Sequence, residues 1–279
     1  MSHLERKGAR LHYEVTGAGP PVLLTHGFAA TSRIWRDQAN ALAPRHEIIA
    51  WDMRGHGRSR AIAEPMLISK GLPNPDHDAQ DNAPPTAAID ESRFSVDQTL
   101  DDMAAILDQR GHDRAVIGGH SLGGYMALAF YEKFPERVRA LLVLATGPGY
   151  KSDAPRDEWN EMAIGFGQRI EKNGLEALRK LDPDMDPKEH ESASELAMAA
   201  RGMLIQRNSQ IIDSLPGIRV PTLVVVGEKD RGYEAASRYM VEKIPDAELI
   251  SIPNAGHAVN LHQPELFNTV AQRFLDRIE

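Results

Sequence analysis

The chain has 279 residues, 42% of them hydrophobic and 26% charged, which suits one large globular α/β domain or a core domain with a modest insertion. Its formal net charge of -8 argues against a nucleic-acid partner, because binding phosphates needs a basic face. It contains no cysteine, which excludes disulfides, thiolate metal ligands and a cysteine nucleophile.

The sequence carries no signal for secretion or for membrane insertion. Its first seven residues, MSHLERK, lack the apolar stretch of a signal peptide. Its apolar runs all fall short of the roughly 20 residues that a membrane-spanning helix needs. We therefore expect a cytoplasmic protein without a membrane partner.

The amino-terminal half alternates between strand and helix patterns. Leu11–Val15 alternates apolar and polar side chains between glycines, which predicts an antiparallel ribbon. Short runs of β-branched residues and leucine predict strands that are buried on both faces of a sheet. Strands are predicted at Val22–Thr25, Glu47–Trp51 and Ala115–Ile117, and helices at Ile34–Leu42, Ser95–Gln109 and Leu122–Phe134. Ser95 with Gln98 makes a capping box for the second of these helices.

Residues 60–93 interrupt this alternation. The segment holds five prolines and shows no sustained hydrophobic period. Irregular stretches of this length are uncommon inside compact domains and are usually functional. Because the segment leaves from the carboxyl edge of a strand, we expect it to form a wall of a site entrance or to contact another subunit of a homo-oligomer.

The carboxyl-terminal part returns to alternating strands and helices. Further strands are predicted at Val138–Leu144, Thr222–Val226 and Glu248–Ile252, and a helix at Tyr233–Lys243. Pro264 starts a last helix whose apolar residues keep to one face. The whole pattern predicts an α/β fold class with a mostly parallel, doubly wound sheet.

Between Thr146 and Pro221 the pattern predicts helices alone. Two apolar stripes at helical spacing run through Trp159, Met162, Ala163, Phe166 and Ile170 and through Leu196, Ala199, Met203 and Leu204. We interpret 147–215 as a helical cap, inserted where the carboxyl end of a strand meets the sheet edge. The core is then assigned to residues 1–146 and 216–279.

The sequence from Gly118 to Gly124, GGHSLGG, joins a short strand to an apolar helix. Its Gly119-x-Ser121-x-Gly123 spacing matches the nucleophile elbow, a strained strand-to-helix turn that exposes a serine hydroxyl at the edge of a sheet. Glycines lack Cβ atoms and so let strand and helix approach closely. Ser121 is therefore a candidate nucleophile.

Two further side chains complete a candidate triad. A neutral serine is a poor nucleophile and needs a base that is itself oriented by an acid. Asp230 follows one predicted strand and His257 follows the next. In a parallel sheet these loops share the carboxyl edge with Ser121, where ligands of open α/β sheets bind.

These motifs make the chain resemble the α/β-hydrolase fold family over nearly its whole length. The matching segments are His26–Phe28, Asp52–Ser59, Gly119–Gly124, Gly227–Asp230 and Gly256–His257. The resemblance is to the branch of serine esterases, carbon–carbon hydrolases and enol-lactonases. It implies Ser121 as nucleophile, His257 as general base and then acid, and Asp230 as the group that holds the imidazole. It also implies an oxyanion hole made by the backbone N–H groups of Phe28 and Leu122.

Other polar residues receive structural readings. Asp52 also ends a strand and is the alternative partner of His257, although its place in the Asp52–Ser59 segment suggests a structural role. His26 and His120 are expected to support loops by hydrogen bonds. Asp76-His77-Asp78 is the nearest approach to a metal motif, but three adjacent ligands do not easily converge on one ion. We expect no metal and no cofactor.

A serine nucleophile points to acyl transfer to water from an ester, thioester, lactone or amide. Relatives that displace halide or open epoxides use an aspartate at the elbow. Relatives that cleave carbon–carbon bonds in vinylogous diketones usually carry a glycine- and proline-rich stretch where this chain has Phe28–Ser32. The resemblance therefore implies a serine hydrolase of small carboxylic esters or lactones that works through an acyl-enzyme. A carbon–carbon hydrolase and a small-molecule receptor on the same fold are the alternatives.

Apolar residues of the predicted cap suggest the nature of the substrate. Trp159, Met162 and Phe166 are candidates for lining a pocket, with Trp35 near its floor. Methionine adapts to irregular ligands, although most methionines on a helix stripe belong to a core. An apolar ester is the hypothesis that this composition supports.

Overall fold

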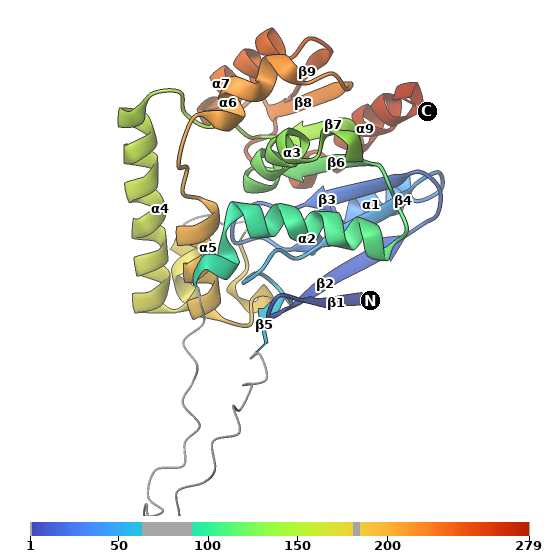
Figure 1. The fold of residues 1–279 in the computed structure, drawn as a ribbon. Helices are drawn as coiled ribbons and strands as arrows, with labels where there is room; N and C mark the ends of the chain where they lie inside the picture. Colours follow the sequence, from blue (N-terminus) through green and yellow to red (C-terminus); the bar gives the residue numbers. More distant parts are fainter. Residues whose placement is uncertain (1, 63–90, 181–184, 279) are drawn as a thin grey trace, which may run out of the picture.

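The computed structural model describes residues 2–62, 91–180 and 185–278, in which one sheet is covered by helices on both faces (Figure 1). The strands are β1 (Ser2–Arg6), β2 (Ala9–Thr16), β3 (Pro21–Thr25), β4 (Glu47–Trp51), β5 (Arg60–Ala61), β6 (Ala115–His120), β7 (Val138–Leu144), β8 (Thr222–Gly227) and β9 (Ala247–Ile252). The α-helices are α1 (Arg36–Leu42), α2 (Val96–Gln109), α3 (Leu122–Lys133), α4 (Asp153–Asn173), α5 (Ala193–Met203), α6 (Gln210–Ser214), α7 (Arg231–Lys243), α8 (Val259–His262) and α9 (Pro264–Ile278). None of the described helices is both long and apolar enough to cross a membrane.

The strand order confirms the predicted parallel sheet. Its order is β1-β2-β4-β3-β6-β7-β8-β9, with β5 beside β2. The pairs from β4 to β9 are parallel, whereas β1, β2 and β5 pair antiparallel at one side. The loops after β3, β4, β6, β7, β8 and β9 therefore meet at one carboxyl edge.

Alternate residues of the central strands pack into two separate hydrophobic cores. Leu23 packs in the core beneath α2 and α3, whereas Val22 and Leu24 pack in the core beneath α1 and α9. These helix pairs cover opposite faces of the sheet (Figure 1). Burial on both faces explains why the central strands are apolar runs without alternation.

The predicted antiparallel ribbon is confirmed, and one other local prediction needs correction. The ribbon is a hairpin of β1 and β2, and its first strand has a polar sequence that carried no strand signal. At the start of α2, Ser95 Oγ accepts a hydrogen bond from the N–H of Gln98 at 3.2 Å, as predicted. The reciprocal half of the capping box is missing, because the Gln98 side chain donates to Asp102 Oδ1 instead.

The segment at 60–93 is described only at its two ends. β5 pairs with β2, and a 3-10 helix, η2 (Glu91–Phe94), leads into α2. Residues 63–90 lie outside the described residues. The wall or subunit contact expected there stays a prediction, as does the expectation that Asp76-His77-Asp78 binds no metal.

Within the described residues, the connection between β7 and β8 is helical, as predicted. It contains α4, α5 and α6 with the 3-10 helices η4 (Leu175–Lys180), η5 (Pro187–Glu189) and η6 (Leu215–Gly217). α4 packs along α5, and α5 packs against η2 (Figure 1). A Cβ at Gly202 would lie 2.4 Å from the carbonyl oxygen of Phe94, so this packing brings the two backbones together. The assignment of 147–215 to a cap remains an interpretation.

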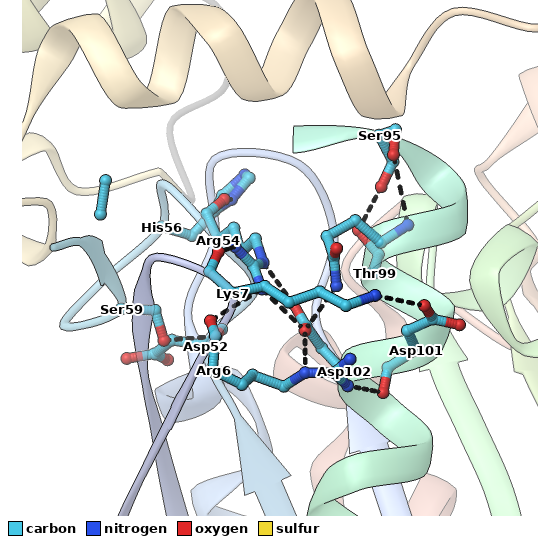
Figure 2. A network of polar contacts seen from close by, with 12 residues as sticks. Arg6, Lys7, Asp52, Arg54, His56, Ser59, Ser95, Thr99, Asp101 and Asp102 are labelled. Atoms are coloured by element: carbon cyan, nitrogen blue, oxygen red, sulfur yellow. Dashed lines mark hydrogen bonds and ion pairs between the residues drawn. The ribbon is translucent and has the colours of Figure 1, made fainter. Parts of the chain in front are cut away.

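A buried ion pair joins the loop after β4 to α2 (Figure 2). Arg54 Nε donates to Asp102 Oδ2 at 2.5 Å and Arg54 Nη2 donates to Asp102 Oδ1 at 3.0 Å. The same guanidinium donates to the carbonyl oxygens of Lys7 and Arg6 in the first hairpin. Both side chains are buried, so the Arg54 charge depends on Asp102 for compensation, while Asp102 also pairs with Arg6 Nε at 3.5 Å.

Replacing Asp102 with alanine is expected to lower the free energy of unfolding by about 3–5 kcal/mol, because it leaves the buried Arg54 charge unpaired. Urea unfolding measures this loss. The double variant Arg54→Met, Asp102→Leu is expected to recover most of it, since both charges are removed together. Glu234→Ala is the surface control, because its pair with Arg238 is exposed and contributes about 0.3–0.5 kcal/mol. An Asp102→Ala loss no larger than that of the control would contradict the prediction.

Candidate active site

Ser121 lies in a strained turn between β6 and α3. Its φ is 52° and its ψ is -117°, which non-glycine residues rarely adopt. A Cβ at Gly119 would lie 2.2 Å from the carbonyl group of Gly123, and a Cβ at Gly123 would lie 2.2 Å from the carbonyl oxygen of Thr25. The two glycines therefore let α3 approach the sheet closely enough to form the turn, as the sequence predicted.

Asp230 and His257 come from neighbouring loops at the same edge. Asp230 stands between β8 and α7, and His257 follows β9. The Nδ1 of His257 lies 2.9 Å from Asp230 Oδ2. A carboxylate can only accept there, so Nδ1 carries the proton and Nε2 is left to accept a proton from another group.

Ser121 and His257 line the same cavity. Among the hydrogen bonds of the described residues, none joins the serine hydroxyl to the imidazole. Contacts between catalytic groups are often long before substrate binds. The arrangement therefore brings a hydroxyl, an imidazole and a carboxylate together in the predicted order.

The two expected oxyanion donors flank this serine. Leu122 is the first residue of α3, where the helix dipole favours negative charge. Phe28 lies in the loop after β3, and a Cβ at Gly27 in that loop would lie 3.3 Å from the Cβ of Ser121. His26 braces the loop: its Nδ1–H donates to the Gly27 carbonyl at 2.7 Å, and its Nε2 accepts the Met53 N–H at 2.9 Å.

His120 supports the other side of the site. Its Nε2–H donates to the backbone carbonyl of His257 at 3.0 Å, which ties the loop after β9 to the elbow. Burial, helped by the neighbouring His257, lowers the pKa of His120 to about 3. Burial likewise lowers the pKa of His26 to about 4, so both rings are neutral at physiological pH. Their contacts agree with the predicted role of loop support.

Asp52 does not serve as the partner of His257. Its two carboxylate oxygens accept the backbone N–H groups of Ser32 at 2.7 Å and Arg58 at 3.0 Å. A Cβ at Gly57 would lie 2.4 Å from Asp52 Oδ2, so the loop wraps tightly around this carboxylate. Asp52 therefore has the structural role that the sequence suggested.

Two cavities meet at Ser121. The larger cavity has a volume of about 470 Å³ and lies beside α3 and α7; the smaller has about 210 Å³ and is lined by the loops that carry Phe28 and His257. Ser121, Trp159 and Leu204 line both. The indole Nε1–H of Trp159 donates to the Leu204 carbonyl at 2.7 Å, which fixes these two residues as a partition between the cavities.

The candidate pocket residues separate into two groups. Trp159 lines both cavities and Phe166 lines the smaller one. Trp35 lies apart from both, because it is buried in the core beneath α1 and α9. Met162 also lies apart from both, and 39% of its surface is exposed.

Sequence reasoning missed the tyrosines of the larger cavity. Tyr125, Tyr150 and Tyr233 line it together with Gln206. Tyr125 follows Ser121 by one helical turn, and Tyr233 follows Asp230 by three residues at the start of α7. Residues one turn away from a candidate catalytic residue share its helix face, so this spacing was a signal that could have found both.

Comparisons with known proteins agree with this geometry. Residues 22–270 match the model of a family described as the alpha/beta hydrolase family. The pimeloyl-acyl-carrier-protein methyl ester esterase of Nitrosomonas europaea is 25% identical over 277 residues, which cover 93% of this chain and 97% of that protein.

Two solved structures are similar over nearly the whole chain. A thermophilic esterase from Thermogutta terrifontis is 26% identical with a TM-score of 0.77, over 97% of this chain and 94% of the esterase. Est816, described as an N-acyl homoserine lactone degrading enzyme, is 28% identical with a TM-score of 0.68, over 98% of this chain and all of that chain.

Proposed function

Since the chain belongs to the alpha/beta hydrolase family, we propose that it is a serine hydrolase that cleaves a small, apolar carboxylic ester or lactone through an acyl-enzyme. The observation that carries this proposal is the 2.9 Å hydrogen bond between His257 Nδ1 and Asp230 Oδ2, beside a serine held in a strained elbow. Esterase and lactone-degrading relatives support the two substrate classes.

The proposed reaction has two halves. Ser121 Oγ attacks the carbonyl carbon while its proton passes to His257 Nε2, and Asp230 stabilises the imidazolium that forms. The N–H groups of Phe28 and Leu122 bind the negative oxygen of the tetrahedral intermediate. His257 then gives its proton to the leaving alcohol. Water, activated by the same imidazole, releases the acid and restores Ser121.

The two cavities suggest how an ester would lie. His257 lines the smaller cavity and must protonate the leaving oxygen, so the leaving group belongs there. The acyl group then enters the larger cavity, whose lining is mostly apolar around Tyr125, Tyr150 and Tyr233. A substrate whose acyl part is bulkier than its alcohol part fits these volumes best.

Narrowing one cavity at a time tests this orientation. Ala236 lines the larger cavity and Leu261 the smaller. Ala236→Phe is expected to lower kcat/KM for hexanoate esters at least 10-fold relative to acetate esters, because each excluded methylene forfeits about 0.8 kcal/mol. Leu261→Trp is the matched variant. It is expected to lower kcat/KM for esters with a large alcohol group relative to esters with a small one. The orientation is wrong if the two variants exchange these effects, and the apolar pocket is wrong if short hydrophilic esters are the best substrates.

A labelling experiment tests the serine mechanism itself. We expect a fluorophosphonate to label Ser121 and p-nitrophenyl acetate to give a burst of nitrophenol equal to the number of sites. Ser121→Ala should abolish both. A screen across esters, lactones and vinylogous diketones then identifies the bond, and a clear preference for the diketones would replace acyl transfer with carbon–carbon cleavage.

A further inference from the structure

Tyr233 contacts two members of the proposed triad, Asp230 and His257. It is the third residue of α7, and its N–H donates to the backbone carbonyl of Asp230 at 3.2 Å. Its ring stacks on the imidazole of His257, with the ring centroids 4.9 Å apart and the planes inclined by 27°. The short spacing from Asp230 therefore places the phenol against the face of the proposed base.

Tyr233 lies in the same cavity as the nucleophile. Ser121 and Tyr233 both line the larger cavity, so the phenol that stacks on His257 also borders the serine. Burial and the nearby Asp230 charge raise the pKa of Tyr233, and the contact with Ser121 opposes that rise. The phenol keeps its proton at neutral pH, so it can donate a hydrogen bond whenever Oγ lacks a proton.

We propose that Tyr233 is a further catalytic residue, which donates a hydrogen bond to Ser121 Oγ as charge develops there and holds the His257 imidazole by stacking. This assignment rests on the proposed function of Ser121. It is distinct from the oxyanion hole, because Phe28 and Leu122 act on the carbonyl oxygen of the substrate whereas Tyr233 acts on the oxygen of the serine.

The donor matters in both halves of the reaction. In acylation, the Oγ–H bond breaks toward His257 Nε2 while the new bond from Oγ to the carbonyl carbon forms. In deacylation, that carbon–oxygen bond breaks and Oγ takes the proton back from the imidazolium. Oγ carries partial negative charge in each transition state, and a neutral phenol stabilises that charge without losing its own proton.

Helix α7 supplies a matched control. Tyr239 lies on the same helix as Tyr233, and the Lys243 ammonium lies 5.4 Å from the centroid of its ring. Tyr239 lines neither of the two cavities at Ser121. Removing the Tyr239 hydroxyl therefore takes a phenol from the same helix and leaves the nucleophile and the cavities untouched.

The test compares Tyr233→Phe, Tyr239→Phe and Ser121→Ala with the unmodified chain. Tyr233→Phe keeps the stacked ring and removes the hydroxyl. We expect kcat for p-nitrophenyl acetate to fall about 10- to 100-fold, the range of a hydrogen bond to a charged group, with KM within twofold. The rate of fluorophosphonate labelling should fall by a similar factor, because labelling also needs attack by Oγ. Tyr239→Phe should keep both rates.

Rates are normalised to the sites that fluorophosphonate finally labels, so that misfolded protein does not count. If Ser121→Ala keeps activity, the proposed function fails. If Ser121→Ala is inactive while Tyr233→Phe keeps or exceeds the original kcat and labelling rate, the triad stands and the role of Tyr233 is overturned. A loss confined to KM would also overturn it, because it would make the phenol a binding group alone.

Discussion

Ser121→Ala is expected to lower kcat for p-nitrophenyl acetate by about 10⁴- to 10⁶-fold, with little change in KM. The substitution removes the oxygen that forms the acyl-enzyme and leaves the two cavities intact. Backbone donors and binding alone then sustain a small residual rate over water. Steady-state kinetics, together with the loss of the nitrophenol burst, measure the effect.

The variant Asp230→Asn tests whether this carboxylate orients His257, and Glu228→Gln is its control. Asparagine cannot fix the Nδ1–H tautomer of His257 as a carboxylate does, and we expect a fall in kcat of about 10⁴-fold. Glu228 lies two residues away, but its carboxylate accepts the N–H of Asn254 at the surface. Its variant should keep nearly full activity. Equal losses in the two variants would refute the assignment of Asp230.

Lowering the pH from 7.5 to 5 is expected to destabilise the fold by several kcal/mol. Burial lowers the pKa of His26 to about 4, of His120 to about 3, and of His56 well below its ordinary value of 6.5. The unfolded chain binds protons at these groups below pH 6.5 whereas the folded chain does not. The stabilisation is therefore fully present above pH 6.5 and falls as the pH drops toward the folded pKa values, by about 2 kcal/mol for each of His26 and His120 at pH 5.

Urea unfolding across this pH range measures how steeply the free energy of unfolding depends on pH. His56→Asn is the informative variant, because His56 Nδ1–H donates to the Arg54 carbonyl and an asparagine amide can replace that donor. The free energy of unfolding of this variant should depend less steeply on pH, because the substitution removes one imidazole whose pKa is lowered by burial. Equal stability at pH 7.5 and 5 would show that these rings are not held neutral by the fold.

Much of the architecture could be predicted from local pattern. The apolar runs at Glu47–Trp51 and Val138–Leu144 form strands with those same bounds, because a strand covered on both faces admits little else. The elbow was recognisable for a similar reason: Gly119 and Gly123 leave no space for a side chain at the contact of strand and helix. Such constraints act between residues close in sequence and can therefore be recognised in the amino-acid sequence.

The residues that line the pocket are set by packing between distant parts of the chain, so local sequence patterns predict them less well. Trp35 and Trp159 look alike in sequence, but helix orientation places the first in a core and the second at Ser121. Met162 and Phe166 are one turn apart on α4, yet only the second faces the smaller cavity. The strand β1 was missed because its pairing with β2, and not its composition, defines it.

The partition between the two cavities bears on how substrate selectivity could change in evolution. Trp159 and Leu204, which divide the space around the serine, both come from the connection between β7 and β8. The serine, carboxylate and imidazole come from loops of the sheet. The partition is thus encoded apart from the proposed triad, so a recombinant that takes only its β7–β8 connection from another parent should keep the reaction and change the substrates that it distinguishes at this partition.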